Sequence, residues 1–451
     1  MIVFRRRLIF WLIKAYLKKW GRSILMFFVF GLLVFFALRI ITQVIPSAFP
    51  FIQRETIGMT GTFTINDLPS PILNMVSRGL TSVSLDGTVK PAIAASWKIG
   101  GNGREYTFFL RRGIYFPDGT HLTSKNVTYN FSDASITRPD DYTIKFKLKD
   151  AYSPFLVTVS RPIFKKGFVG LGEYSIKSIK LNGNFVTSID LVSNGIEKRV
   201  AKYQFFPTED AVKTAFVMGE VSRIIGIRDG TFKKTTLSSF KSVTTNRVLN
   251  DQQLITLFYN TQDRVLSEKK VREALVYAIP DVFPNGERNP SPFSPRSWAD
   301  QGTNIHLQDI EHAKNLLATS NNATGSSNLK FVIKTLSQYK EIAKILVGSF
   351  KKIGIDTKVE VVETIPSNFQ MFLGDINLAK DPDQYVLWHS GQNNNISGYK
   401  NLRIDKLLED GRKTSDINER KKIYSDFEKY ILDDPPASFL YLPYTYEISR
   451  I

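Results

Sequence analysis

Tight-turn residues between Gly79 and Phe131 constrain the fold more than any other feature of the chain. The Asp-Gly pairs at 86–87 and 118–119 favour the positive φ angles of hairpin turns, and Gly-Gly-Asn-Gly at 100–103 marks a further reversal. Residues 105–110, between two of these turns, have the composition of a strand. This part of the chain is therefore predicted to be β-rich, with short strands and surface turns.

The motifs in this stretch follow one another in a specific order. Lys-Pro-x-Ile-Ala-x-Ser-Trp at 90–97 precedes Gly-Arg-Glu-Tyr-Thr-Phe-x-Leu-Arg at 103–111, and Phe-Pro-Asp-Gly-Thr-x-Leu-Thr follows at 116–123. The series resembles the signature of the family 5 extracellular solute-binding proteins, the oligopeptide and dipeptide receptor class of ABC importers. One departure is Ser-Lys-Asn at 124–126, where the family usually has Ala, a charged residue and Asp. This departure affects a helix start more than a pocket.

The resemblance implies an α/β fold of two lobes, the type II periplasmic-binding-protein-like fold with an enlarged β-rich first lobe. It implies a lobe I at 56–253 with a return segment at 436–451, and a lobe II at 254–435. The helix at 271–279, Val-Arg-Glu-Ala-Leu-Val-Tyr-Ala-Ile, matches the family's helix after the first crossing between lobes. The second crossing is expected near 436–448. Members of the family generally continue some tens of residues further, so either the chain is a fragment or its first lobe closes differently.

The period of the apolar residues changes near Leu329 and indicates a βαβ unit. Residues 329–335 and 357–362 have strand patterns, and an apolar stripe of helical spacing runs from Ile342 to Ile353 between them. Because a helical crossover joins parallel strands, the second lobe is predicted to contain parallel pairs. A further connector, at 321–328, is rich in turn residues.

An apolar run at 24–38 is the second strong constraint. We interpret 23–41 as one transmembrane helix, 1–22 as a basic cytoplasmic segment and 42–55 as a linker. The seven Lys and Arg residues that precede the run, without any Asp or Glu, place the N-terminus inside by the positive-inside rule. The globular part is then expected on the outer, periplasmic or extracellular side of the cytoplasmic membrane. A cleaved signal is the alternative, but no clear small-x-small site follows the long apolar run.

Composition excludes several kinds of chemistry. The absence of cysteine excludes disulfides, thiolate metal sites, cysteine nucleophiles and a lipidated cysteine. The formal charge is +18, and eight of the 60 Lys and Arg but none of the 42 Asp and Glu lie in residues 1–42, which leaves +10 on the remainder. We interpret this charge as a solvated basic face and not as a nucleic-acid surface, because basic residues are not interleaved with aromatic ones.

Motif searches indicate a protein that is not an enzyme and that holds no cofactor or metal. The glycine-rich residues 100–103 lack the Lys-Ser/Thr of a Walker loop, and a Gly-x-Ser-x-Gly elbow is absent. ATP hydrolysis would therefore be supplied by other chains. The histidines do not have metal-ligand spacing. They are His121, His306, His312 and His389.

The polar segment at 380–390 is the strongest candidate for a ligand pocket. It combines carboxylates, an aromatic residue and hydroxyl or amide donors, the groups that a polar solute requires. It also resembles the family's Asp-Pro-Asp region beside the cleft. The alternative is an Asx-Pro turn that ends a strand, with Trp388 in the core. Leu378 stands where peptide receptors of the family often carry the carboxylate that meets the peptide's amino terminus, and Asp381 or Asp383 could serve instead.

The resemblance adds two further segments to the candidate site. Residues 77–80 match a loop that faces the cleft in the family, where Arg78 could pair with a ligand carboxylate or be a surface arginine. Residues 260–261 follow the strand at the first crossing. The residues predicted to contact the ligand are Ser77, Arg78, Gly79, Leu80, Asn260, Thr261, Asp381, Asp383, Trp388, His389 and Ser390.

The resemblance implies a monomeric solute receptor that closes on a small solute, most simply a short peptide. Permease and ATPase subunits would be separate chains, and no nucleic-acid partner is expected. A membrane-anchored sensor or cell-surface interaction protein with the same fold is the alternative.

Overall fold

The computed structural model describes residues 6–48, 53–196, 198–302, 307–320 and 329–450. The chain forms two compact units, the first made of Met1–Arg54 with Gly195–Val200 and the second of Glu55–Asn194 with Ala201–Ile451. The predicted connector at 321–328 and His306 lie outside the described residues.

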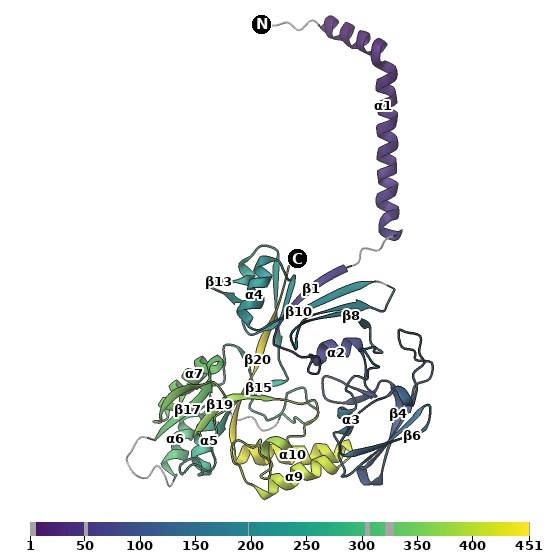
Figure 1. The fold of residues 1–451 in the computed structure, drawn as a ribbon. Helices are drawn as coiled ribbons and strands as arrows, with labels where there is room; N and C mark the ends of the chain where they lie inside the picture. The colour runs from purple at the N-terminus through teal and green to yellow at the C-terminus, as the bar shows by residue number, and fades with distance from the viewer. Residues whose placement is uncertain (1–5, 49–52, 197, 303–306, 321–328, 451) are drawn as a thin grey trace, which may run out of the picture. The chain divides into compact units, whose positions relative to one another are not determined.

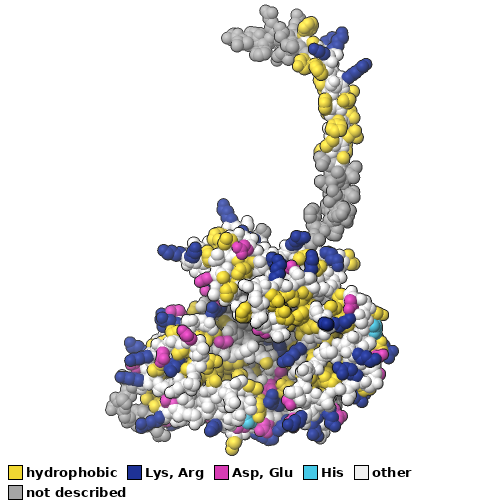
Figure 2. Space-filling view, viewed as in Figure 1, with side chains coloured by type: hydrophobic (Ala, Val, Ile, Leu, Met, Phe, Trp, Pro, Cys, Tyr) yellow, Lys and Arg dark blue, Asp and Glu magenta, His cyan; other side chains and the backbone are white. Residues whose placement is uncertain are grey.

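The first unit contains one long helix, α1 (Arg6–Ala48). Its segment Ile13–Ala37 has a mean hydropathy of 1.9 and is long enough to cross a membrane. Apolar side chains are visible along its surface (Figure 2). Large ones among them are exposed, for example Trp11 at 74% and Phe27 at 70%. The helix begins inside the predicted basic segment 1–22, because the Lys and Arg there favour helix as well as leucine does.

The second unit is organised by one 12-stranded sheet (Figure 1). Its strand order is β18-β17-β19-β15-β20-β11-β1-β10-β9-β8, and β14 and β16 each pair with β20. The bounds are β1 (Gln53–Thr60), β8 (Tyr174–Asn182), β9 (Phe185–Ser193), β10 (Arg199–Phe206), β11 (Arg223–Ile227), β14 (Val243–Leu249), β15 (Gln253–Tyr259), β16 (Gly286–Arg288), β17 (Lys330–Leu336), β18 (Asp356–Val362), β19 (Met371–Asn377) and β20 (Ala437–Arg450).

The long strand β20 connects two groups of strands. Its first residues pair antiparallel with β15, with Leu257 opposite Ser438. Its last residues pair antiparallel with β14 and β11, with Arg223 opposite Ser449. The second crossing, expected near 436–448, therefore coincides with one strand, β20, that begins at Ala437 and continues to Arg450.

A separate four-stranded sheet has the order β4-β5-β7-β6 and covers a compact aromatic core. The predicted strand at 105–110 is β5, and Gly87 and Gly119 have φ of +85° and +80°, as their turns require. Two smaller two-stranded sheets are β2-β3 and β12-β13. The bounds are β2 (Thr81–Val83), β3 (Val89–Pro91), β4 (Ala94–Gly100), β5 (Glu105–Leu110), β6 (Ala134–Asp140), β7 (Thr143–Leu148), β12 (Thr231–Phe232) and β13 (Thr235–Thr236).

Helices cover the part of the large sheet that contains β15 to β19. The predicted βαβ unit is confirmed, because β17 and β18 are parallel and α7 joins them. The apolar stripe of α7 packs into a core with α5, α6 and β15. The helices are α2 (Ser70–Val76), α3 (Phe155–Thr158), α4 (Glu209–Met218), α5 (Lys269–Tyr277), α6 (Ile310–Ala318), α7 (Lys340–Lys352), α8 (Tyr385–Trp388), α9 (Leu402–Lys413) and α10 (Ile417–Asp433).

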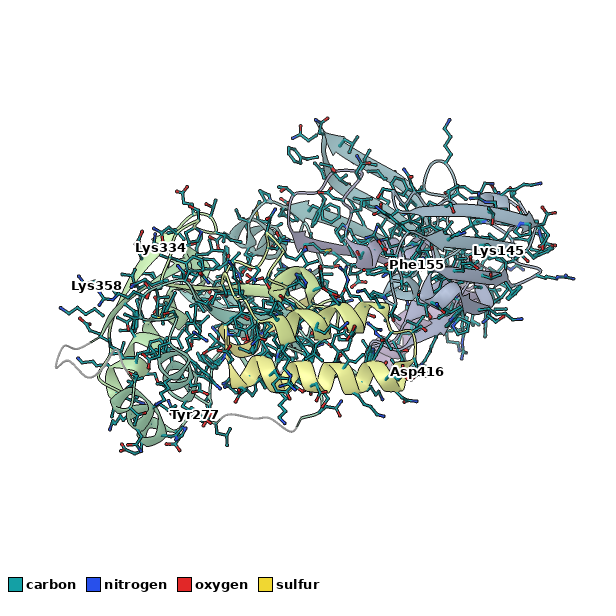
Figure 3. All side chains as sticks on the ribbon, turned by 90° about the horizontal axis from the view of Figure 1, so that it is seen from below. Lys145, Phe155, Tyr277, Lys334, Lys358 and Asp416 are labelled. Carbon is teal, nitrogen blue, oxygen red and sulfur yellow. The ribbon has the colours of Figure 1, made fainter. Side chains whose placement is uncertain are left out.

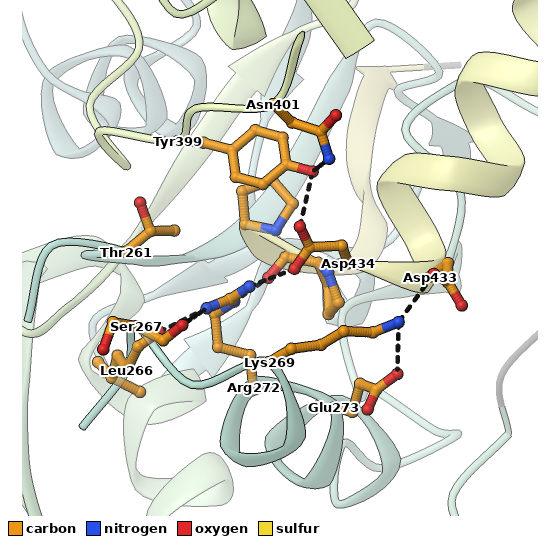
Figure 4. Close-up of polar contacts among 12 residues, drawn as sticks. Thr261, Leu266, Ser267, Lys269, Arg272, Glu273, Tyr399, Asn401, Asp433 and Asp434 are labelled. Carbon is orange, nitrogen blue, oxygen red and sulfur yellow. Dashed lines mark hydrogen bonds and ion pairs between the residues drawn. The ribbon is translucent and has the colours of Figure 1, made fainter. Parts of the chain in front are cut away.

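A buried arginine holds the junction between α10 and β20 (Figure 4). Arg272 of α5 is 4% exposed, and its Nε donates to the carbonyl of Pro435 at 2.9 Å. Its other nitrogens donate to the carbonyls of Leu266 and Ser267 and to the carboxylate of Asp434. The start of β20 is therefore fixed to α5 by one side chain.

Candidate functional site

The segment between β19 and α8 forms consecutive Asx turns. The Oδ1 of Asp381 accepts a hydrogen bond from the backbone N–H of Asp383 at 3.1 Å, and the Oδ1 of Asp383 accepts one from the N–H of Tyr385 at 3.1 Å. The backbone of this segment therefore has the Asx turns that the alternative interpretation of the sequence expects. The carboxylates also have other partners, which decide what each can contact.

The carboxylate of Asp381 forms an ion pair with Arg420 of α10. Both Asp381 and Arg420 are buried, and the two guanidinium nitrogens donate to the two oxygens at 3.0 and 2.8 Å. Burial disfavours the charged guanidinium, but the Asp381 carboxylate more than offsets this and raises the pKa of Arg420. Asp381 therefore acts as a tether for the segment in this conformation.

The carboxylate of Asp383 faces Arg412 of α9, with 2.9 Å between Oδ2 and Nε. Burial raises the pKa of Asp383, and Arg412 opposes that shift. The Arg412 guanidinium carbon lies 4.4 Å from the ring centroid of Tyr385 and 5.0 Å from that of Tyr152. Arg412 thus joins the Asx turns to a tyrosine from the predicted lobe I.

Trp388 lies in the core, which corrects its assignment as an aromatic wall of the pocket. Its side chain is 1% exposed and packs with Phe258 and Phe439, and its Nε1 donates to Gln384 at 2.7 Å. The indole N–H has found an internal partner, as buried tryptophans usually do. Tyr385, three residues earlier, is the partly exposed aromatic residue of this segment.

His389 and Ser390 have partners on α9. The His389 ring lies 4.2 Å from the Tyr385 ring, and its Nε2 is 3.5 Å from Oε1 of Glu409. Hydrogen bonds from Lys413 and from His389 lower the pKa of Glu409. The backbone N–H and hydroxyl of Ser390 both donate to the carboxylate of Asp405.

The predicted residues 77–80 lie around the turn after α2. The Ser77 hydroxyl donates to the carbonyl of Ile163, and Leu80 is fully buried in the core of the four-stranded sheet, so its side chain is corrected to a core residue. Gly79 packs against the backbone of Ser160, where a Cβ would lie 2.4 Å from the Ser160 carbonyl carbon. Arg78 is exposed and forms an ion pair of 3.5 Å with Glu173.

Asn260 and Thr261 stabilise the end of β15. The Asn260 side chain donates to the carbonyl of Phe369 at 2.9 Å, and the Thr261 hydroxyl donates to the carbonyl of Ser397 at 2.9 Å. Ligand contacts from these residues remain a prediction.

A large cavity in the second unit, of about 820 Å³, lies beside Arg412. One wall comes from the four-stranded sheet and α3, and the other from α8 and α9. The backbone N–H of Ser153 donates to the carbonyl of Arg412 at 2.6 Å, so the two walls touch at one edge. Figure 3 shows α9 and α10 reaching the region of Phe155, with Asp416 at the start of α10. The lining residues are Asn130, Phe131, Ser132, Asp133, Ala134, Leu148, Lys149, Asp150, Ala151, Tyr152, Phe155, Thr158, Tyr385, Glu409, Arg412 and Lys413.

The lining contains aromatic rings and charges of both signs. Phe131, Tyr152 and Tyr385 supply apolar area. Acidic and basic side chains on both walls can orient a solute that carries both charges. Of the predicted site residues, Asp383 and His389 contact this lining through Arg412, Tyr385 and Glu409.

Sequence reasoning missed Tyr152, Glu409 and Arg412. Arg412 lies in the last turn of a helix, where a cation is commonplace because of the helix dipole, so its sequence position carries no functional signal. Across the described residues, no group of three or more His, Cys, Asp or Glu side chains is arranged to hold a metal ion.

Comparison with known families shows to which family the chain belongs. The model of the bacterial extracellular solute-binding proteins, family 5, matches residues 88–398, more than half of the chain. The chain belongs to this family. The family 5 match spans the four-stranded sheet, the cavity wall from that sheet and α3, and the Asx turns, and it ends before Glu409, Arg412 and Lys413 of the other wall. It is a solute-binding family, which supports a role without catalysis.

Curated relatives of this family 5 protein carry different binding descriptions. The oligopeptide-binding protein AppA of Bacillus subtilis is 25% identical over 460 residues, which cover 84% of this chain and 83% of AppA. The probable D,D-dipeptide-binding periplasmic protein DdpA of Escherichia coli is 20% identical, with 78% and 79% covered. Heme-binding protein A of Haemophilus influenzae is 22% identical, with 77% and 78% covered.

Solved structures establish the two-lobed α/β fold of this family 5 chain. The substrate-binding protein CtaP of Listeria monocytogenes aligns with a TM-score of 0.73 and 19% identity, over 88% of this chain and 94% of CtaP. NikZ of Campylobacter jejuni, solved with Ni(L-His), aligns with a TM-score of 0.68 and 22% identity, over 88% and 94%. At these identities the likeness shows the fold and leaves the solute open.

Proposed function

We propose that this chain is the membrane-anchored receptor of an ABC importer and that it captures a short peptide in the 820 Å³ cavity. The receptor acts as a monomer and delivers the peptide to a permease whose ATPase subunits are separate chains. Family membership supports the receptor role. The lining of the cavity is the observation that supports a peptide.

The lining suits the chemistry of a peptide. A peptide has an ammonium group, a carboxylate and apolar side chains, and the cavity offers acidic groups, basic groups and aromatic rings. Its volume lies within the range of about 300–1,000 Å³ that is usual for small-molecule sites. Leu378, which replaces the carboxylate expected from the family, is 7% exposed and packs in the core, so the ammonium group would have to bind elsewhere.

The position of the cavity supports a mechanism of closure. Its walls come from 130–158 and from 385–413, which belong to the predicted lobes I and II. A ligand that contacts both walls stabilises the closed form in proportion to its extra contacts there. The closed form would then be the one that the permease recognises.

The helix α1 supports anchoring without a lipidated cysteine. The 25-residue segment Ile13–Ala37 is long enough to span a bilayer, and the basic residues before the apolar run at 24–38 favour an N-terminus inside. The second unit would then lie on the outer side of the cytoplasmic membrane. Mass spectrometry of the protein isolated from membranes should show the intact N-terminus, and a chain that begins after residue 41 would contradict the anchor.

Calorimetry with the full chain in nanodiscs tests peptide capture. We expect peptides of two to nine residues to bind and to raise the melting temperature, while free amino acids bind weakly. Tyr152→Leu removes an aromatic ring from the cavity and should weaken binding, whereas Tyr115→Leu, an exposed site in the same lobe outside the lining, should not. Haem and nickel with histidine are the comparison solutes, because relatives bear those names. Binding of either without any peptide binding would overturn the peptide proposal.

A further inference from the structure

The guanidinium of Arg412 is held in a fixed orientation at the cavity wall. Its Nε lies 2.9 Å from the Oδ2 of Asp383, a side chain that is 9% exposed. The rings of Tyr385 and Tyr152 lie 4.4 and 5.0 Å from its central carbon. An acid at the Nε edge and two rings nearby restrict the rotamers that the side chain can adopt.

The other edge of this guanidinium can still receive an anion. Arg412 is 27% exposed at its side chain and lines the cavity. Asp383 is the carboxylate with which it pairs. Burial raises the pKa of Tyr152, and a hydrogen bond with Arg412 opposes that shift, so the Tyr152 hydroxyl occupies one donor. An arginine has four N–H groups on its terminal nitrogens, so donors remain for a ligand, and their planar fork matches the two oxygens of a carboxylate.

Two further cations line the cavity, but Asp133, Asp150 and Glu409 line it as well, so the total charge alone does not set a preference for an anion. Lys149 comes from the wall opposite Arg412, and Lys413 is the next residue on α9. Lys413 is partly neutralised by Glu409 at 3.2 Å, and both lysines are exposed, so neither is oriented as Arg412 is. A solvent-exposed lysine contributes charge, but the fixed arginine contributes direction.

Arg412 also lies where the two walls meet. Its carbonyl accepts the hydrogen bond from Ser153, and the residue before Ser153 is the tyrosine that faces its guanidinium. A carboxylate bound there would therefore lie at the junction of the 148–158 segment with α9. The contacts of that carboxylate with both walls would be lost when the two walls move apart.

We propose that Arg412 is the carboxylate-binding residue of the cavity and that the receptor selects solutes with a free carboxylate, for a peptide its C-terminal group. This inference rests on the proposed peptide-binding function. It assigns Asp383 a positioning role, since Asp383 orients Arg412 and does not itself contact the ligand.

Matched peptides with a free and an amidated C-terminus test the inference on the unmodified full chain in nanodiscs. We expect the amidated peptide to bind at least tenfold more weakly, because charge-assisted bidentate hydrogen bonds are lost. The preference should shrink to less than threefold in Arg412→Met. Arg412→Lys should keep only part of it, since lysine has the charge without the fork. Arg403→Met, on the same helix but over Tyr430 and outside the lining, should keep the full preference.

Two outcomes separate the inference from the function on which it rests. If no peptide binds the unmodified chain, the peptide-binding function fails and the subsite fails with it. If free and amidated peptides bind equally, only the Arg412 assignment is overturned. Because Arg412→Met leaves the Asp383 carboxylate without its cation, the double variant Arg412→Met, Asp383→Asn provides the same measurement without an unpaired buried charge.

Discussion

Arg420 donates to both carboxylate oxygens of Asp381, at 3.0 and 2.8 Å, across 39 residues of sequence. Its Nε also donates to the carbonyl of Gly411 at 2.9 Å. One side chain on α10 thereby fixes both the Asx turns and the end of α9. These are the two segments that bring Asp383 and Arg412 together at the cavity.

Arg420→Met should strongly destabilise the second unit. The substitution leaves the Asp381 carboxylate buried without a cation, for which a loss of about 3–5 kcal/mol is typical. Lys406→Met is the control, because it breaks an exposed i,i+4 pair with Asp410 and should leave the stability nearly unchanged. Urea unfolding followed by tryptophan fluorescence measures both. Equal losses would show that the buried pair has no special structural role.

Gly87→Ala should be more harmful than Gly119→Ala, although both glycines have positive φ, +85° and +80°. A Cβ on Gly87 would lie 2.5 Å from the carbonyl oxygen of Lys380, whereas a Cβ on Gly119 meets open space. Both substitutions incur the backbone strain of roughly 1 kcal/mol. Only the first also displaces the turn whose Asp86 carbonyl accepts from the Trp298 N–H at 2.9 Å.

Hydrogen exchange at the Trp298 amide distinguishes these two effects. We expect Gly87→Ala to accelerate exchange there and Gly119→Ala to leave it unchanged. Protection that survives in Gly87→Ala would mean that Lys380 moves aside without disturbing the contact.

Local sequence signals predicted the elements whose partners are near in sequence. The Asp-Gly turns, the strand Glu105–Leu110 and the parallel β17–β18 pair all follow from residue type and spacing within short windows. Thr208 has the residue type of a helix cap, and its hydroxyl accepts from the N–H of Ala211. Such features depend on backbone geometry, which a few neighbouring residues determine.

The partners and the burial of the polar candidate residues could not be predicted from local sequence. Asp381 and Asp383 lie in the same short polar segment, but they have different partners. Arg420 donates to the carboxylate of Asp381, and Arg412 forms an ion pair with that of Asp383. Trp388 follows a polar run and still enters the core, because Phe258 and Phe439 from distant strands cover it. Each outcome depends on packing between elements that lie far apart along the chain.

Glu428 should make the stability of the second unit depend on pH. The side chain is 2% exposed and accepts from the Ser291 hydroxyl at 2.5 Å. Burial, with a contribution from Asp300, raises the pKa of Glu428 to about 7 from an ordinary 4.5. Since the folded state holds this proton more tightly, the contribution is fully present below pH 4.5 and is lost as pH rises through about 7.

Glu428→Gln should therefore be more stable than the unmodified chain at pH 8 and should lose part of the pH dependence between 4.5 and 7. The amide resembles the protonated carboxyl in shape and carries no charge. Asp426→Asn, at an exposed position of the same helix, is the control and should leave the pH profile unchanged. Urea midpoints measured between about pH 4.5 and pH 8 test this prediction, and a Gln variant that is less stable than the unmodified chain at pH 8 would contradict the assignment.

Arg272→Lys should destabilise the junction between α10 and β20 even though the charge is kept. The guanidinium serves three carbonyls and the Asp434 carboxylate in different directions, which an ammonium on a flexible stem cannot reproduce. Buried acceptors left without donors cost about 1–3 kcal/mol each, so we expect a loss of at least about 2 kcal/mol in urea unfolding. Lys269→Met, which breaks a half-exposed pair with Asp433, should cost about 1 kcal/mol or less.

Because β20 begins two residues after the Pro435 carbonyl that Arg272 holds, amide exchange in Ala437 and Ser438 should rise in Arg272→Lys and not in Lys269→Met. Unchanged exchange in both would place the stability of this junction in the β15–β20 pairing instead.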